Sequence, residues 1–195
     1  MRNKSKLVFG VGINDADYSV AAICDGRQVM CLFYRKWKDM LRRCYSEEYQ
    51  SKHPTYKGCT VCEGWLNFTA FKAWMSGQPW QERNIDKDLL IDGNKIYSAE
   101  TCVFIDEATN KLLSDSGAKR GEWPVGVSFH RMSDRFRAEC SENGKTKHIG
   151  LFDTPEEAHN EYLNFKSRMI VQSALRQPDP RVYKALRKKA IEILL

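Results

Sequence analysis

The sequence predicts an α+β fold whose C-terminal half is a three-stranded antiparallel sheet packed on one helix. Three short runs of alternating polarity indicate the strands, and they occupy residues 126–131, 135–140 and 145–152. Met132-Ser133-Asp134 separates the first two runs and Glu142-Asn143-Gly144 the last two. An Asn-Gly pair accommodates the positive φ angles of a tight hairpin, so the three strands are expected to be sequential neighbours.

A helix is expected to follow the third strand and to cover one face of the sheet. Thr154 can cap it, Pro155 suits the first helical position, and Glu157 lies three residues after the cap. The apolar positions that share one side of this helix are Ala158, Tyr162, Phe165 and Met169. Alternation along the strands gives the helix a face made of Val127, Phe129, Phe136, Ala138, Cys140 and Ile149. It leaves on the other face Ser128, His130, Arg137, Glu139, Thr146 and His148.

This second face is small, polar and partly cationic, and it has two interpretations. A half-exposed antiparallel sheet ordinarily has a polar outer face. Alternatively, a sheet of two or three strands can enter a DNA major groove, where Arg can pair with guanine and Glu can accept a hydrogen bond from cytosine. Alternation by itself favours the ordinary solvated sheet.

Four motifs in this half occur in a specific order. They are Gly126-Val127, the Phe-x-Ala-Glu of 136–139, the Ile-Gly-x-Phe-Asp-Thr-Pro-Glu-Glu-Ala of 149–158, and Tyr162. This order closely resembles the APETALA2 (ethylene-response-factor) DNA-binding domain, including the versions attached to phage HNH homing endonucleases. In that family the sheet lies in the DNA major groove and the helix packs behind it, so the resemblance implies double-stranded DNA as the partner.

The resemblance and the polar face together give a set of candidate DNA-binding residues. These are Ser128, His130, Arg131, Arg135, Arg137, Glu139, Lys145, Lys147 and His148. Ser128, His130 and His148 stand where the plant domains have arginines and a tryptophan. The resemblance therefore implies no particular target sequence.

Composition is consistent with an intracellular protein that binds a polyanion. The 195 residues carry 31 basic and 25 acidic side chains, a net charge of +6. No apolar run is long enough to span a bilayer, and the start Met1-Arg2-Asn3-Lys4 is unlike a signal peptide. We therefore expect a cytoplasmic protein that does not bind membranes, in the bacterial host cytoplasm if it is phage-encoded. Seven cysteines, an odd number, favour reduced thiols or metal ligands over disulfides.

The N-terminal half is expected to be mixed. Short strands are predicted at 7–12 and 28–32, and no chemistry is assigned to residues 1–32. A helix over 33–45 has one apolar side and one basic side, which is either a solvated face or a surface that follows phosphates. A second helix, rich in aromatic residues, is predicted over 63–77, and its aromatic side chains are interpreted as core.

Residues 85–105 carry a second resemblance, with a predicted strand, a turn at Asp92-Gly93-Asn94 and a helix capped by Ser98. Together with Arg43-Cys44, the Val-Cys-Glu-x-Trp of 61–65 and the aromatic helix, this segment looks like the degenerate ββα modules of phage HNH homing endonucleases. The resemblance spans about 33–105. It implies cleavage of a phosphodiester bond with the help of Mg²⁺.

Carried over by position, the resemblance makes Asp86 the carboxylate that holds Mg²⁺ and places Lys87 where the general-base histidine is expected. Thr101 stands in place of the metal-binding asparagine, and no histidine lies within 63–122. Asp88 is a substitute candidate for the base, and His53 could approach in space, but no motif supports either. The alternative is that Asp86 and Asp88 pair with nearby cations or cap a turn.

Cys59-x-x-Cys62 has the spacing of zinc ligands but is only half of a site. Cys44 and Cys102, which the resemblance places in the same module, could complete a structural Zn²⁺ site. The alternative is that these thiols are ordinary buried core residues.

The chain is thus expected to comprise N-terminal strands at 1–32, a degenerate HNH-like module at 33–113, a linker at 114–122, an APETALA2-like domain at 123–172 and a basic C-terminal helix at 173–195. The basic helix could dock on the body, track DNA or pair with a second copy. Two functions follow as hypotheses. One is a DNA-binding protein resembling a homing endonuclease with metal-dependent cleavage, and the other is an inactive derivative that regulates through DNA or binds a host protein.

Overall fold

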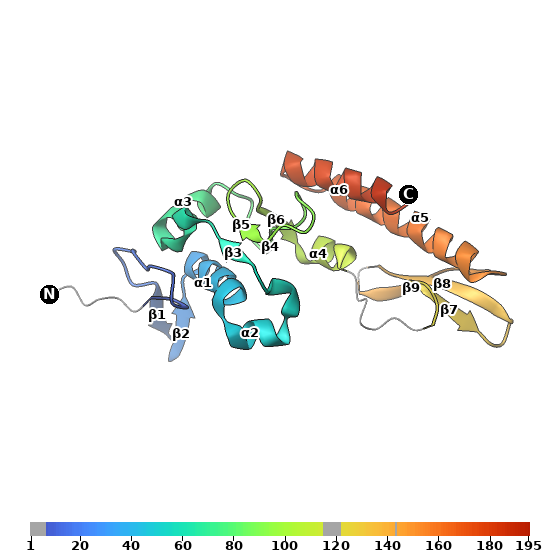
Figure 1. Ribbon diagram of the computed structural model, residues 1–195, viewed down its shortest axis with the longest axis horizontal. Coiled ribbons are helices and arrows are strands. Elements are labelled where there is room, and N and C mark those ends of the chain that lie inside the picture. Colours follow the sequence, from blue (N-terminus) through green and yellow to red (C-terminus); the bar gives the residue numbers. More distant parts are fainter. Residues whose placement is uncertain (1–6, 115–121, 143) are drawn as a thin grey trace. The chain divides into compact units, whose positions relative to one another are not determined.

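The structure is a computed structural model that describes residues 7–114, 122–142 and 144–195. The chain has the α+β class expected from its sequence, and it divides into two compact units, residues 1–104 and 105–195. Figure 1 shows the elements of both units along the chain. Most of the predicted linker, residues 115–121, lies outside the described residues. Within the described ranges, no helix has the length and apolar character needed to cross a membrane.

The first unit consists of short helices and strands. In chain order they are β1 (Ala21–Cys24), β2 (Arg27–Met30), α1 (Leu32–Tyr45), α2 (Glu47–Lys52), β3 (Thr60–Val61), α3 (Phe68–Ser76), β4 (Arg83–Asp86), β5 (Ile96–Tyr97) and β6 (Val103–Asp106). Two 3-10 helices, Pro54–Tyr56 and Glu63–Leu66, lie before β3 and before α3. β1 pairs with β2 in an antiparallel hairpin, β3 pairs with β5 in parallel, and β4 pairs with β6.

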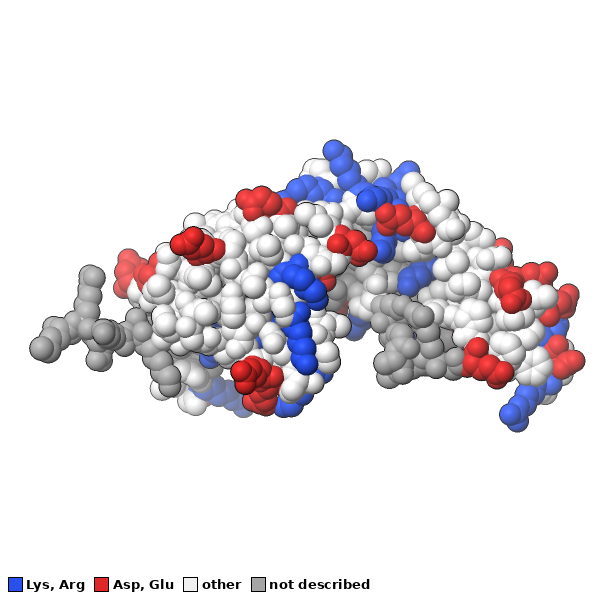
Figure 2. Space-filling model, in the orientation of Figure 1, with Lys and Arg blue, Asp and Glu red and all other residues white. Residues whose placement is uncertain are grey.

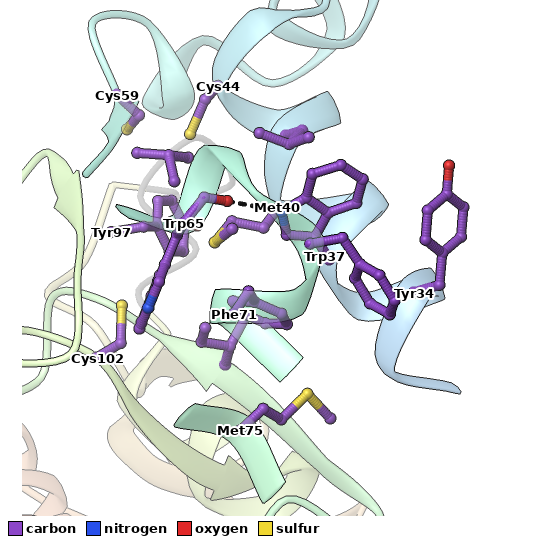
Figure 3. Packing of buried hydrophobic residues seen from close by; sticks show 14 of the residues in the cluster. Tyr34, Trp37, Met40, Cys44, Cys59, Trp65, Phe71, Met75, Tyr97 and Cys102 are labelled. Atoms are coloured by element: carbon purple, nitrogen blue, oxygen red, sulfur yellow. Dashed lines mark hydrogen bonds between the residues drawn. The ribbon is translucent and has the colours of Figure 1, made fainter. Parts of the chain in front are cut away.

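An aromatic core organises these elements (Figure 3). The Trp37 side chain of α1 is fully buried, and its indole Nε1–H donates a hydrogen bond of 2.7 Å to the carbonyl oxygen of Trp65. A buried indole needs such a partner, so this bond fixes α1 against the 3-10 helix before α3. Phe68 and Phe71 of α3 are also fully buried, which confirms the interpretation of the aromatic helix as core.

Three local predictions for this unit are wrong. The strand expected at 7–12 is a single bridge between Val8 and Gly12. The helix expected over 63–77 is broken, because Asn67 adopts an extended conformation and its neighbours pair with Ile13: Ile13 N donates to Leu66 O, and Phe68 N donates to Ile13 O. These bonds come from a distant part of the chain, so local periodicity does not reveal them.

The third error concerns the helix expected after Ser98. Ser98 and Thr101 instead form one hydrogen-bonded turn, after which the chain continues directly into β6. A helix does follow, but it is α4 (Glu107–Leu113), where Asp106 accepts a hydrogen bond from Thr109 N at 2.7 Å and acts as the cap.

The second unit contains the predicted sheet and its helix. Its elements are α4, β7 (Val127–His130), β8 (Arg135–Glu142), β9 (Lys145–Phe152), α5 (Pro155–Ala174) and α6 (Pro180–Glu192). The sheet order is β7-β8-β9 and all pairs are antiparallel, as predicted. The predicted turn between β8 and β9 includes Asn143, which lies outside the described residues.

Helix α5 begins where the sequence indicates and packs on one face of the sheet. Thr154 Oγ1 accepts the hydrogen bond of Glu157 N at 3.2 Å, and Pro155 is the first helical residue. Ala138 of β8 and Ala158 of α5 are both fully buried in this contact. Phe129 lies on the expected inward face, directly opposite Phe136, but it is 39% exposed and packs edge-on against Phe136.

Gly126 allows Tyr162 of α5 to approach the start of β7. Its φ is +80°, and a Cβ atom placed there would lie 2.1 Å from Cδ2 of the Tyr162 ring. Its carbonyl oxygen accepts a hydrogen bond of 2.8 Å from Glu139 N. Because glycine has no Cβ, this position can adopt a left-handed backbone and also allow the close contact with the Tyr162 ring.

We predict that Gly126→Ala lowers the free energy of unfolding of the second unit by about 3 kcal/mol, since it adds left-handed strain and a clash with Tyr162. Gly144→Ala is the matched control, because Gly144 has φ +78° and, apart from its chain neighbours, no described residue lies within 4 Å of the position of a Cβ. It should cost about 1 kcal/mol, from backbone strain only. Urea unfolding of both variants measures the difference, and equal losses would contradict the ring contact.

Candidate nucleic-acid interface

The face of the sheet opposite α5 carries the polar residues that the sequence assigned to it. Across the strands, Ser128 of β7 faces Arg137 of β8, and Arg137 faces Leu151 of β9. A second cross-strand pair joins His130 and Arg135, and a third joins Glu139 and His148. Directly opposed residues point to the same side of a sheet. These Ser, His, Arg and Glu side chains therefore form a continuous surface that extends over all three strands.

A bulge between Ala138 and Glu139 sets the outer face of β9. Ile149 takes no partner in the register, so the alternation of β9 changes phase at this residue. As a result His148 and Leu151 both lie on the outer face. Alternation along a single strand does not predict Leu151 there, and only the cross-strand register reveals it.

Arg137 is central to the outer face. Its Nη2 lies 3.2 Å from Oε2 of Glu139, and its Nε donates a hydrogen bond of 3.4 Å to Ser128 Oγ. Its side chain is 37% exposed. The two contacts hold the guanidinium in place while the remaining N–H donors stay available to a ligand.

The margin of this face has a second fixed cation. Arg135 Nε donates a hydrogen bond of 2.9 Å to Asp153 Oδ1, just after β9. His130 Nδ1 lies 2.8 Å from Ser133 Oγ in the turn between β7 and β8. Arg131 is exposed in the same turn. Asp153 and Ser133 were not singled out from sequence, because their contacts depend on the meeting of strand ends.

Lys145 and Lys147 do not share the outer face. Lys145 faces Glu142, and Lys147 faces Cys140, a residue buried beneath α5. Both lysines therefore project from the α5 side of the sheet, near the end of the hairpin, where they are exposed. A ligand on the outer face would meet them only by reaching around this end.

The second candidate site, at Asp86-Lys87-Asp88, forms a tightly bonded turn. Oδ1 of Asp86 accepts hydrogen bonds from the backbone N–H groups of Asp88 at 2.9 Å and of Leu89 at 2.7 Å. Burial raises the pKa of Asp86, and the two backbone donors partly offset this effect. Asp86 thus acts as the cap of a turn, one of the two roles that the sequence left open.

Lys87 is 5% exposed and lies inside this turn. Its ammonium group donates to the carboxylate of Asp88, and at 2.7 Å to the carbonyl oxygen of Asn94. Asn94 Nδ2 in turn donates to the carbonyl oxygens of Lys87 and Ile96, at 2.8 Å and 2.7 Å. These contacts assign Lys87 a structural role in the turn.

Hydrogen bonds inside this turn engage oxygen atoms of the candidate Mg²⁺ ligands, and the Mg²⁺ interpretation stays a prediction. Thr101, at the position of the missing asparagine, donates its hydroxyl to the carbonyl oxygen of Ile96 at 2.7 Å. Asp86 and Asp88 already accept hydrogen bonds from this turn. Mg²⁺ requires oxygen ligands in near-octahedral geometry. Across the residues that the structure describes, no three or more His, Cys, Asp or Glu side chains are grouped so as to hold a metal ion.

The four candidate zinc ligands lie in or at the edge of the core of the first unit. Cys44, Cys59 and Cys102 are buried, and Cys62 is half-buried. Burial raises the pKa of both Cys44 and Cys102 to about 12, so these thiols are protonated at neutral pH. Figure 3 shows Cys44 and Cys59 close to each other and Cys102 farther away. Packing accounts for these thiols, and the Zn²⁺ interpretation stays a prediction.

Comparisons with known proteins add no relative to this picture. No family model matches the chain, and neither the curated proteins nor the solved structures include a match.

We predict that Lys87→Ala lowers the free energy of unfolding of the first unit by about 2 kcal/mol, because the carbonyl of Asn94 loses a buried donor and a cavity remains. Asp88→Ala should cost less than about 1 kcal/mol, because the Asp88 side chain is 53% exposed. Urea unfolding measures both variants. A Lys87→Ala protein of unchanged stability would remove the structural role and restore Lys87 as a candidate base.

Proposed function

We propose that this chain is a DNA-binding protein that recognises double-stranded DNA through the outer face of the sheet β7-β8-β9. The observation that carries the proposal is Arg137, a half-exposed guanidinium fixed on the middle strand by Ser128 and Glu139. A sheet of this width fits a major groove, and Arg on such a surface can bind the O6 and N7 atoms of guanine. The packing of α5 on the opposite face leaves this side available to the ligand.

Glu139 gives the same face a second means of discrimination. Its carboxylate can accept a hydrogen bond from the N4 amino group of cytosine, while His148 lies directly across from it. Glu139 also repels phosphate, so a duplex without a suitable base at this position gains less from the sheet. The Arg137–Glu139 pair therefore favours selective over general binding.

Affinity for the backbone is expected from cations outside the outer face. Helix α6 packs on α5 through Val182, Leu186 and Ala190, with Ser167 Oγ donating to Ala190 O at 2.7 Å. Of the three roles left open by the sequence, docking on the body is thus the one seen. Lys and Arg side chains gather over α6 (Figure 2), and Lys184, Arg187 and Lys188 are exposed. Such cations add salt-dependent, sequence-independent affinity.

We predict that Arg137→Ala relaxes sequence preference. After selection of a preferred duplex from a random pool, the ratio of its affinity to that of a scrambled duplex should fall roughly tenfold or more, the effect of losing one bidentate base contact. Lys145→Ala is the control, because Lys145 lies on the α5 side and should leave the ratio unchanged. Fluorescence anisotropy measures both ratios. If Arg137→Ala lowers affinity equally for both duplexes, the sheet does not read bases.

We also propose that the chain acts as a regulator without hydrolytic activity, the alternative to the homing endonuclease that the resemblance implies. The observation that favours the regulator is the turn at 86–88, where the candidate base and carboxylates are engaged by their own surroundings. The DNA-binding role places the protein in the compartment that holds the DNA, which the resemblance implies is the cytoplasm of a bacterial host.

We expect a shift of duplex DNA without cleavage when the protein is incubated with supercoiled and linear DNA in Mg²⁺, in Mn²⁺ and in EDTA. One gel reports both binding and nicking. A nick that needs the metal and disappears in Asp86→Ala would establish the nuclease instead. Neither a shift nor a nick would overturn both DNA-binding roles and redirect the search to a host-protein partner.

A further inference from the structure

A groove of about 460 Å³ lies in the first unit between β2 and α1. Arg35, Lys38 and Arg42 of α1 line one side of it, together with Asp39. Val29 of β2 and Leu32, at the start of α1, are among its apolar lining residues. One side of the groove belongs to residues 1–32, to which no chemistry was assigned, and the other side is the basic helix that the sequence left open as a solvated face or a surface that follows phosphates.

The groove is lined by more basic than acidic side chains. Arg42 Nη2 lies 3.1 Å from Asp39 Oδ1, so this pair is internally neutral. Arg35 and Lys38, by contrast, form no ion pair with any residue in the described parts of the chain. The groove thus presents two uncompensated positive charges on one helix, three residues apart and hence on the same side.

The apolar lining of the groove is exposed to an unusual extent. Val29 is 52% exposed and Leu32 is 46% exposed. The occupant should therefore present negative charges to the helix and apolar groups to these two side chains. A DNA strand has both, because its phosphates alternate with deoxyribose rings whose edges carry only C–H groups at the 2′ position. A ribose has a hydroxyl there, which would have to lose water against Val29 or Leu32.

We propose that this groove binds the sugar-phosphate backbone of duplex DNA, as a second, sequence-independent contact made by the first unit. Arg35 and Lys38 bind phosphate oxygens, and Val29 and Leu32 contact the intervening deoxyribose. The inference rests on the proposed function, since the same duplex is expected to meet the sheet of the second unit. It gives β2 a role as one wall of a DNA contact.

The test uses the full-length chain carrying Arg35→Gln and Lys38→Gln together. The matched control is Lys52→Gln with Lys57→Gln, which removes the same charge from exposed positions of the first unit outside the groove. Affinity for the preferred duplex and for a scrambled duplex is measured by anisotropy between 50 and 200 mM salt, roughly the range over which phosphate contacts are distinguished. Circular dichroism confirms that each variant is folded.

Loss of two phosphate contacts should reduce the slope of log affinity against log salt by about 1.8. Both duplexes should weaken by the same factor, roughly tenfold or more at the lower salt concentration, with the sequence preference kept. The control should retain the slope of the unaltered protein. Val29→Asp, which places a carboxylate in the apolar lining, should weaken both duplexes as well.

Two results would overturn the inference. One is an unchanged slope in the groove variant while the unaltered protein still binds its preferred duplex, in which case the proposed function survives and the groove is not part of it. The other is loss of affinity for an acidic peptide, poly-glutamate, with no loss for the duplex, which would make the groove a protein-binding site. Failure of the proposed function itself is distinguished because the unaltered protein would then show no preferred duplex at all.

Discussion

The packing of α5 against the sheet is the contact on which the second unit depends. Ala138 and Ala158 are both fully buried where strand and helix meet, so no large side chain separates the two elements. Tyr162 lies against the backbone of Gly126 in the same interface. A sheet with a helix on one face needs apolar residues on that face only, so the other face is free to carry polar groups. The position of the helix therefore determines which side of the sheet can serve a ligand.

In the first unit the corresponding constraint is the satisfaction of buried polar groups. Trp37 donates to the carbonyl of Trp65, and the buried Lys87 donates to Asp88 and to the carbonyl of Asn94. Each bond joins segments that are irregular or short, where strand ladders supply few partners. Hydrogen bonds from side chains at 86–94 thus stabilise the turn, in a region where the strands are too short to do so. These hydrogen bonds give Lys87 and Asn94 a structural role in this region.

The elements predicted correctly are those encoded by neighbouring residues. The Thr154-Pro155 start of α5 and the hairpin strands of the second unit depend on capping, turn residues and alternation, all of which act within a few positions. The errors at Asn67 and Ser98 have another origin. Asn67 is extended because its neighbours pair with Ile13, and the turn at Ser98 is fixed by Thr101, whose hydroxyl reaches back to Ile96. Interactions between segments that meet only in the folded chain leave no pattern of apolar residues in the local sequence, so they cannot be predicted from it.

The candidate sites show the same division. Alternation placed Arg137, Glu139 and His148 on the outer face, but it could not indicate the bulge that adds Leu151 or the pairing of Arg135 with Asp153. Similarly, the basic side of α1 was evident from the sequence, whereas the groove beside it depends on Phe9 and β2 lying next to that side in the folded chain. A charge pattern in the sequence indicates which class of ligand a protein can bind. The shape of the surface that binds the ligand depends on contacts between segments distant in the sequence.

The two guanidinium groups of the outer face are each paired with a carboxylate of the same unit, Arg137 with Glu139 and Arg135 with Asp153. Exposed pairs of this kind contribute less than about 1 kcal/mol, so a base or phosphate can take the place of the carboxylate at little cost. Until that exchange occurs, the pairs keep the net charge of the face near zero and its attraction for arbitrary DNA weak. General affinity must then come from cations without partners. Under the proposed function, Arg35 and Lys38 of the first unit supply part of this affinity, and the residues that select a sequence are then distinct from those that hold the duplex.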